Sequence, residues 1–209
     1  ADVLSSSLLK AVTGAFPGIR LRIAMGYAGT LLRWLENGEV DAALLYGPEH
    51  SSNIQARPLI KEPLWVIGPK GTPLRRGQPV PLAKLARKPM ILPSAPHGIR
   101  TLVEHACAVS NVQLNISAES NALSVQRSLV IGGHGWTILP PIAVADDLRT
   151  KQLAGAPLSD PAITRTIVLA LPSNRSGGPH VRCVVDLLVE CAKAAVDSGS
   201  WLEGCWLAD

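Results

Sequence analysis

Helical and extended segments alternate from the beginning of this chain, and only short turns separate them. The first segment has apolar side chains at helical spacing and is ended by Phe16-Pro17-Gly18. In the next, Ile19, Leu21 and Ile23 alternate with arginines, which predicts a strand that is half exposed or lies at a sheet edge. The predicted elements are a helix over residues 2–15, a strand over 19–23, a helix over 31–37 and a buried strand over 41–46. This order is typical of parallel β-α-β units and predicts an α/β fold.

The core of such a fold must be aliphatic, because only 4% of the residues are aromatic while 47% are hydrophobic. Runs of Leu, Val, Ile and Ala suit buried strands that helices cover on both faces. A chain of 209 residues can bury about 70% of its unfolded surface, so the fold requires no disulfide or metal. The cysteines show no zinc-ligand spacing. At Cys107, Cys183, Cys191 and Cys205 we expect buried free thiols in a reducing compartment, with disulfides as the alternative.

A stretch rich in proline and glycine, residues 69–81, marks a boundary between two sets of elements. The further predicted elements are strands over 54–60 and 64–68, a short helix over 81–86, a strand over 90–92, a helix over 98–109, strands over 113–118 and 136–139 with a helix over 122–131 between them, and a strand over 164–171. Gly178 and Pro179 open the last long helix. The helix over 2–15 has no strand ahead of it, and we expect that strand upstream of Ala1 in a longer protein.

Basic residues are scattered along the chain, although its formal net charge is +4. The densest pairs are Arg75-Arg76 and Arg87-Lys88, and both lie in sequence that is rich in proline or glycine and indicates solvated loops. A nucleic-acid interface would gather several cations on one element, so we expect none here. No apolar run approaches the roughly 18 residues of a membrane span, and no signal peptide opens the chain. We therefore expect no membrane contact and a cytoplasmic location.

Three loops ahead of predicted helices carry candidate ligand-binding residues, since helix N-termini offer free backbone N–H groups. In the first loop, residues 26–30, Tyr27 can wall a pocket or donate a hydrogen bond, and Thr30 offers a hydroxyl. The alternative is that Thr30 is only the N-cap of its helix and that Tyr27 is a surface residue. The sequence leaves both interpretations open.

The second loop, residues 94–100, is the most polar of the three and supplies Ser94, His97 and Arg100 as candidates. Arg100 lies near a predicted helix start, where its charge opposes the helix dipole, so a partner is expected. That partner is either an anionic ligand or Glu104, one helical turn away. For His97, a role as a loop or hinge residue competes with ligand binding.

The third loop, residues 119–124, contains Ser120 and Asn121, either of which can be an N-cap. Asn121 is also a ligand candidate. Motifs of hydrolases, nucleotide-binding loops and zinc proteases are missing from the sequence, so we expect neither an enzyme nor a cofactor or metal site. The glycine-rich residues 132–135 follow a predicted helix and precede a strand, which indicates a helix end and turn rather than a phosphate loop.

Four sequence blocks share their order and spacing with one known family. They are Phe16-Pro17-Gly18-Ile19-Arg20-Leu21-Arg22-Ile23 with Gly26 ahead of a helix, Leu35-Glu36-Asn37-Gly38-Glu39-Val40-Asp41-Ala42-Ala43-Leu44, Leu59-Ile60-Lys61-Glu62-Pro63-Leu64-Trp65-Val66, and Val130-Ile131-Gly132-Gly133-His134-Gly135-Trp136-Thr137-Ile138-Leu139-Pro140. Together they resemble the effector-binding region of LysR-type transcriptional regulators. The resemblance covers the chain from Asp2 to Val196.

The resemblance implies a fold of the type II periplasmic-binding-protein kind, in which two Rossmann-like subdomains are joined by a two-strand hinge. Subdomain I would comprise residues 1–66 and 165–209, and the inserted subdomain II residues 67–164. The family's winged helix-turn-helix and the first strand of its effector domain have no counterpart in these residues. Contact with DNA is therefore expected only through a domain outside them.

The resemblance also implies a function: sensing a small, anionic effector in the cleft between the subdomains, and dimerisation, with tetramers in the full-length protein. Family effectors contact loops that match the three described above, which implies effector-binding roles for Tyr27, Thr30, Ser94, His97, Arg100 and Asn121. The family's pairing helix matches residues 30–37, so Leu31 and Trp34 are candidate interface residues, with core packing as the alternative. A periplasmic solute-binding protein of a transporter and a small-molecule enzyme of the same fold are the alternative functions.

Overall fold

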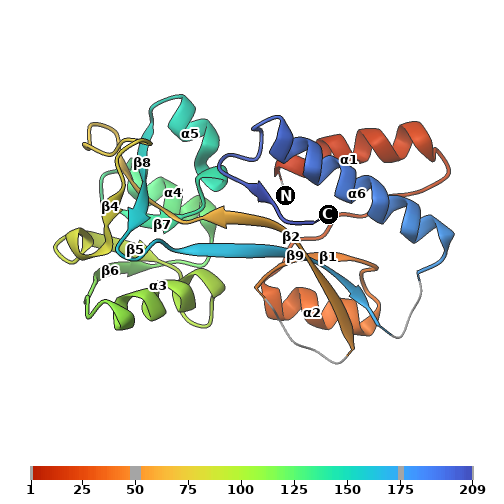
Figure 1. Cartoon of the computed structure of the whole chain (residues 1–209), viewed down its shortest axis with the longest axis horizontal. Coiled ribbons are helices and arrows are strands. Elements are labelled where there is room, and N and C mark those ends of the chain that lie inside the picture. The colour runs from red at the N-terminus through yellow and green to blue at the C-terminus, as the bar shows by residue number, and fades with distance from the viewer. Residues whose placement is uncertain (1, 48–52, 174–176, 209) are drawn as a thin grey trace. The chain divides into compact units, whose positions relative to one another are not determined.

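The computed structural model describes residues 2–47, 53–173 and 177–208, and the chain forms two compact units. Unit 1 combines Ala1–Lys61 with Thr166–Asp209, and unit 2 is the inserted segment Glu62–Arg165. The chain leaves unit 1 within strand β2 (Ile54–Pro63) and returns within β9 (Thr164–Pro172) (Figure 1). The family resemblance predicts these crossings at residues 66 and 165.

Unit 1 contains a four-stranded sheet with the order β1-β9-β2-β10, together with helices. Its remaining elements are α1 (Asp2–Ala15), α2 (Ala28–Asn37), β1 (Ala43–Tyr46), α6 (Pro179–Asp197) and β10 (Cys205–Trp206). Helix α2 buries Leu35 completely against β1, where Leu45 is its partner in the core. Helices α1 and α6 pack against each other. The aliphatic core that the composition required is therefore present in this unit.

Helix ends in unit 1 follow local signals in the sequence. Gly38 closes α2 in the left-handed conformation, with φ of +74°, and its N–H donates to the carbonyl of Leu35. Pro179 begins α6 at a position where a missing N–H costs nothing. The predicted bounds of α1 and the predicted end of α2 at Asn37 are both confirmed.

Unit 2 contains a four-stranded sheet, β4-β8-β3-β7, and a parallel pair, β5-β6. Its elements are β3 (Trp65–Pro69), β4 (Val80–Pro81), η1 (Leu82–Leu85), β5 (Pro89–Leu92), α3 (Gly98–Val109), β6 (Asn115–Glu119), α4 (Leu123–Ile131), β7 (Thr137–Leu139), η2 (Pro141–Val144), α5 (Ala145–Arg149) and β8 (Leu153–Ser159). Strand β3 lies between β7 and β8 and is buried from Trp65 to Gly68. It is the centre of the unit's aliphatic core.

The strand predicted over residues 19–23 is wrong: this segment belongs to no sheet in the structure. The strand over 41–46 does form, as β1, but it pairs antiparallel with β9 instead of parallel with the preceding segment. Alternation of apolar and polar residues specifies which face of a strand is buried. It does not supply the neighbour whose backbone must complete the hydrogen bonds.

Two predicted helix caps are also wrong. Helix α2 begins at Ala28, so Tyr27 is the N-cap residue, without a side-chain cap, and Thr30 lies inside the first turn. Helix α4 begins at Leu123 with Ala122 as N-cap, so neither Ser120 nor Asn121 has that position. In both places the chain enters the helix at a residue other than the one with the best capping side chain.

The C-terminal residues fold back onto unit 1. Strand β10 pairs antiparallel with β2, with Trp206 opposite Ile60, and Trp201 is buried. This pairing covers the β2 edge of the sheet, which would otherwise present unpaired backbone groups. None of the helices in the described part of the chain is both long enough and apolar enough to cross a membrane.

A buried ion pair joins the two crossing strands where they enter unit 2. Nε of Arg165 donates to a carboxylate oxygen of Glu62 at 2.5 Å. The Glu62 side chain is fully buried and that of Arg165 is 9% exposed. Removing one member of such a pair leaves the other charge buried and uncompensated, which typically costs about 3–5 kcal/mol.

We expect Glu62→Ala to lower the free energy of unfolding by about 3 kcal/mol, because Arg165 loses its buried counter-ion. Urea unfolding followed by circular dichroism measures this. The matched control is Asp146→Ala, which breaks the exposed pair between Asp146 and Arg149 and should change stability by about 0.5 kcal/mol or less. Equal losses in the two variants would contradict the role of the buried pair.

Candidate ligand-binding site

Two polar loops lie together at one end of the parallel strands β5 and β6. Because the carboxyl ends of parallel strands meet at the same edge, the loops after Leu92 and after Glu119 are neighbours. The backbone N–H of Ser120 donates to the Leu92 carbonyl at 3.0 Å. The N–H of Ser94 donates to Oδ1 of Asn121, also at 3.0 Å. The structure therefore brings together the second and third loops that the sequence singled out.

Arg100 holds these loops from the first turn of α3. Its Nε donates to Glu104 at 2.6 Å, and its Nη1 donates to Glu119 at 2.5 Å and to the carbonyl of Pro93 at 3.1 Å. The carboxylates of Glu119 and then Glu104 raise the pKa of the guanidinium, which stays charged. The pair with Glu104, one of the two partners considered from the sequence, is present. Glu119 is a second partner that sequence spacing does not reveal.

His97 is the N-cap of α3, and its Nδ1 accepts a hydrogen bond from the backbone N–H of Ile99 at 3.2 Å. Burial, and then the nearby positive charge of Arg165, lower the pKa of the imidazole. The ring is therefore neutral at pH 7, and because Nδ1 is the acceptor, its proton lies on Nε2. His97 is a hydrogen-bonding group here rather than a cation.

Gln126 is a buried polar residue that the sequence reasoning missed. Its side chain is on α4, is 2% exposed and donates from Nε2 to the carbonyl of Ser120 at 2.7 Å. Its Oε1 accepts from the hydroxyl of Thr137 on β7 at 3.2 Å. These bonds fix the loop that contains Asn121. A lone glutamine among the aliphatic positions of a predicted helix was the available signal.

Two hydroxyl groups among the candidate residues have no hydrogen-bond partner in the described part of the chain. Ser94 uses its backbone N–H but not its hydroxyl, and the residue is half-buried in the loop that leads into α3. Thr30, in unit 1, uses its backbone N–H to the Tyr27 carbonyl but not its hydroxyl. Tyr27 itself is exposed. These hydroxyls are available to a ligand without breaking a contact that holds the fold.

The two candidate interface residues lie on α2 in unit 1. Leu31 is partly buried and packs against the core formed by Leu35, Ala43 and Leu45. The Trp34 ring lies against the backbone at Gly26, where a Cβ atom would be 3.3 Å from its Cζ3. Both side chains thus pack within their own chain, which is the alternative to a role at an interface. Their role at an interface between chains stays a prediction.

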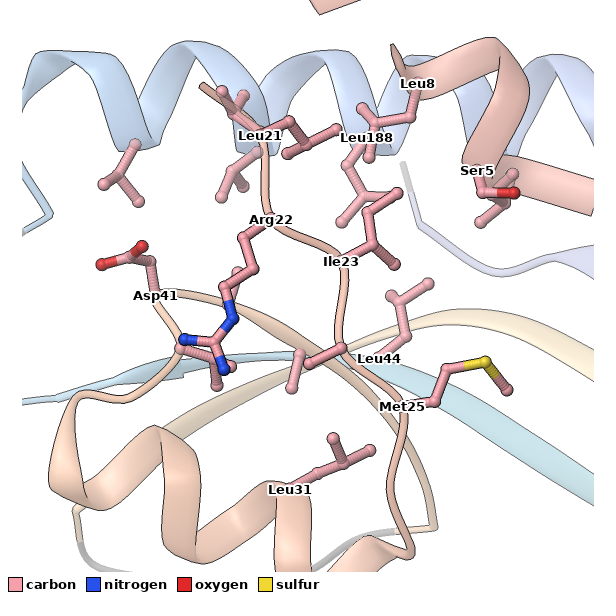
Figure 2. Close-up of a pocket in the computed structure, with 18 of the residues that line it drawn as sticks. Ser5, Leu8, Leu21, Arg22, Ile23, Met25, Leu31, Asp41, Leu44 and Leu188 are labelled. Carbon is pink, nitrogen blue, oxygen red and sulfur yellow. The ribbon is translucent and has the colours of Figure 1, made fainter. Parts of the chain in front are cut away.

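Unit 1 also contains an apolar groove of about 450 Å³, distinct from the polar loops of unit 2. Figure 2 shows Leu8 of α1 and Leu188 of α6 on one side of it, Leu31 of α2 on the other, and the segment around Ile23 running between them. None of the candidate residues of unit 2 lines this groove, and of those in unit 1 only Leu31 does.

The thiols are free, but the prediction that they are buried is wrong: Cys107, Cys183 and Cys191 are partly buried and Cys205 is exposed. Burial and then the charge of Glu104 raise the pKa of the Cys107 thiol, which lowers its thiolate fraction at neutral pH. Among the described residues, no three His, Cys, Asp or Glu side chains gather as a metal site would require.

The model of the LysR substrate binding domain family matches residues 1–193. The chain belongs to this family. Among curated relatives, the HTH-type transcriptional regulator BbuR of Bordetella bronchiseptica is 28% identical over 96% of this chain and 62% of its own length. A probable hydrogen peroxide-inducible genes activator of Mycobacterium leprae is 30% identical over 91% of this chain and 61% of its own length. The chain thus spans about three fifths of the length of these relatives.

Solved structures show the same fold. The effector binding domain of QuiR in complex with shikimate has a TM-score of 0.77 at 23% identity, over 90% of each chain. The CcmR regulatory domain of Synechocystis PCC6803 in complex with 2-PG has a TM-score of 0.79 at 19% identity, over 89% of each chain. The predicted α/β fold of the type II periplasmic-binding-protein kind is confirmed, and the LysR assignment with it.

Because one relative is named for hydrogen peroxide, the reactivity of the thiols in this chain is informative. We expect iodoacetamide at pH 7.5 to alkylate Cys107 at least about tenfold more slowly than Cys205, since the thiolate is the nucleophile. Mass spectrometry of proteolytic peptides measures both rates, and the chain unfolded in urea, where both thiols should react alike, is the control. Faster reaction of Cys107 in the native chain would indicate an activated thiol instead.

Proposed function

We propose that this chain senses a small anionic effector for a LysR-type transcriptional regulator, and that Ser94, His97, Arg100 and Asn121 of unit 2 and Tyr27 and Thr30 of unit 1 contact the effector. The observation that carries the proposal is the pair of rigidly tied loops at the carboxyl ends of β5 and β6. Ser94, whose hydroxyl has no hydrogen-bond partner among the described residues, belongs to the loop that leads into α3. We also propose that the effector binds between the subdomains, as the family resemblance implies.

An anion is the preferred ligand for three reasons. The N-terminus of the 12-residue helix α3 supplies partial positive charge. Shikimate, found with one structural relative, is a carboxylate. A ligand carboxylate would also compete with Glu119 for the guanidinium of Arg100, because the two groups have the same charge and geometry.

Binding would regulate through a shift of populations. An effector that contacts residues of both units binds one arrangement of the units more tightly than others and therefore stabilises it. In the whole regulator, we propose that this change alters how paired chains present their DNA-binding domains, with Leu31 and Trp34 at the contact between chains. The curated relatives are named as transcriptional regulators or gene activators, which supports this role over transport or catalysis.

A thermal-shift screen with carboxylates, shikimate included, tests the proposal directly. A ligand at about 100 times its Kd should stabilise the chain by about 2.7 kcal/mol, which raises Tm by roughly 5–10 °C for a chain of this size. We expect Ser94→Ala and Thr30→Ala each to raise the Kd of the strongest carboxylate about tenfold. Each removes a hydroxyl that has no internal partner, so Tm without ligand should not change.

Two matched variants are the controls for the hydroxyl substitutions. Ser110→Ala lies at the opposite end of α3 from Ser94, and Thr13→Ala lies on an exposed face of α1. Neither should change the Kd. A screen in which no carboxylate raises Tm would exclude an anionic effector from that panel, and weaker binding in all four variants would show that the loss is not local.

The role of Arg100 has its own test. We expect Glu119→Gln to lower the Kd for a carboxylate about threefold or more, because the ligand no longer displaces a carboxylate from the guanidinium. Isothermal titration calorimetry measures this, with Glu104→Gln as the comparison. An unchanged or higher Kd in Glu119→Gln would make Arg100 a residue that only positions the loops.

A further inference from the structure

The charged residues of this chain are divided unequally between its two units. Unit 2 contains 11 Lys and Arg residues against six Asp and Glu, a net charge of +5. Unit 1 contains nine against ten, a net charge of −1. From Pro63 to Val103 the sequence has no acidic residue at all. The positive charge of the chain therefore belongs to unit 2.

Five of the six carboxylates of unit 2 form ion pairs, and the arginines in those pairs all lie outside residues 70–88. The pairs are Glu62–Arg165, Glu104–Arg100, Glu119–Arg100, Asp146–Arg149 and Asp147–Arg127. The seven other cations of the unit are Lys151 and those within residues 70–88. Only the carboxylate of Asp160 remains to offset them within the unit.

Strand register brings part of this charge to one end of the unit. Pro69, the last residue of β3, lies opposite Leu153, the first residue of β8. Lys70 and Lys151 therefore lie just beyond the same end of this strand pair (Figure 1). The loop after β3 turns at once, because the hydroxyl of Thr72 donates to the Pro69 carbonyl at 2.9 Å.

The indole ring of Trp136 connects this loop to the residues that precede β5. Nζ of Lys88 lies 5.0 Å from the centre of the ring, within the range of a cation–π contact. A Cβ atom at Gly68 would be 3.3 Å from the Trp136 ring and equally close to the side chains of Thr72 and Leu74. Cations from two separate segments thus lie around one aromatic side chain.

We call the exposed cations of this region the basic end of unit 2: Lys70, Arg75, Lys84, Arg87, Lys88 and Lys151. Between Tyr46 and Val109, no large apolar side chain of the described chain is exposed. Protein partners usually bind through buried apolar and aromatic anchors, which this surface does not offer. A phosphate backbone requires cations on a polar surface, and that is what the basic end provides.

We propose that the basic end of unit 2 binds the phosphate backbone of DNA without reading its sequence. Curated relatives of this chain are named as transcriptional regulators, which work on DNA. In a regulator whose DNA-binding domain already holds the DNA, tethering raises the effective concentration, so even a weak contact is populated. From the sequence we expected no such interface, because the cations are scattered along the chain. Folding gathers them from separate segments.

This surface is distinct from the proposed effector site. Lys88 precedes the amino end of β5, whereas the loops of the effector site follow Leu92 and Glu119, at the carboxyl ends of β5 and β6. DNA and effector would therefore use different residues. The proposal does not depend on effector binding, and it can fail or hold independently of it.

Fluorescence anisotropy with a labelled duplex of about 24 base pairs tests the proposal on residues 1–209. We expect the logarithm of the association constant to fall linearly with the logarithm of the NaCl concentration, with a slope of about −4 or steeper. Each neutralised phosphate contributes about −0.9 to that slope, because it releases condensed counterions. A duplex of unrelated sequence should bind equally well.

Paired charge variants locate the contact. Arg87→Gln combined with Lys151→Gln should make the slope shallower by about 1.8 and weaken binding in about 100 mM NaCl at least tenfold. The control, Lys10→Gln combined with Arg33→Gln in unit 1, changes the net charge equally and should alter neither quantity. All four side chains are exposed, so Tm should stay within about 2 °C in both variants.

The other possible results would each overturn the proposal. Equal weakening in the two double variants would show that overall charge, and not the basic end, attracts the duplex. No binding of the duplex in about 50 mM NaCl would exclude a DNA contact by this chain. Tighter binding of poly-glutamate than of the duplex, lost in the unit 2 variant, would identify an acidic protein segment as the partner.

Discussion

The requirement that every extended segment find a backbone partner governs this structure. Strand β3 meets it fully, because β7 and β8 flank it, and unit 2 builds its core around that strand. Strand β1 meets it on one edge only. The segment at residues 20–26 does not meet it within the described chain, and so it lies apart from the sheet despite the alternating pattern of a strand. The apolar groove follows from this difference between the two units.

Hydrogen bonds of polar side chains likewise explain how the loops of the candidate site are held in place. Arg100, Asn121 and Gln126 use their side chains to hold two loops, through contacts with Glu119, the Ser94 backbone and the Ser120 carbonyl. Loops that are tied in this way lose less conformational entropy when a ligand binds. The hydroxyl groups of Ser94 and Thr30 take no part in these contacts. The hydrogen bonds in the described part of the chain therefore use Arg100 and Asn121 to hold the loops and leave these two hydroxyl groups, which we propose for effector binding, without an internal partner.

The sequence predicted helices better than it predicted strands, sites and caps. Helix α1, helix α3 and the ends marked by Gly38 and Pro179 depend on side-chain periodicity and on single residues with special backbone preferences, which are local properties. The prediction of the fold and of its inserted unit rested on four sequence blocks that share their order and spacing with the family. The preferences of single residues and their near neighbours do not contain that information. The strand predicted over residues 19–23 was wrong because strand pairing depends on residues that are distant in the chain, which local alternation does not report.

By itself, the sequence determined the aliphatic α/β character of this protein, the order of its helices, its membership of a regulator family and the polar loops that we propose for effector binding. Only the tertiary structure decided that Glu119 joins Glu104 as a partner of Arg100, that Asn121 holds Ser94, and that Glu62 and Arg165 form a buried pair. These partners lie 19, 27 and 103 residues apart in the chain. Periodicity reports on neighbours within a few residues, whereas hydrogen bonds and ion pairs form between whichever groups folding brings together.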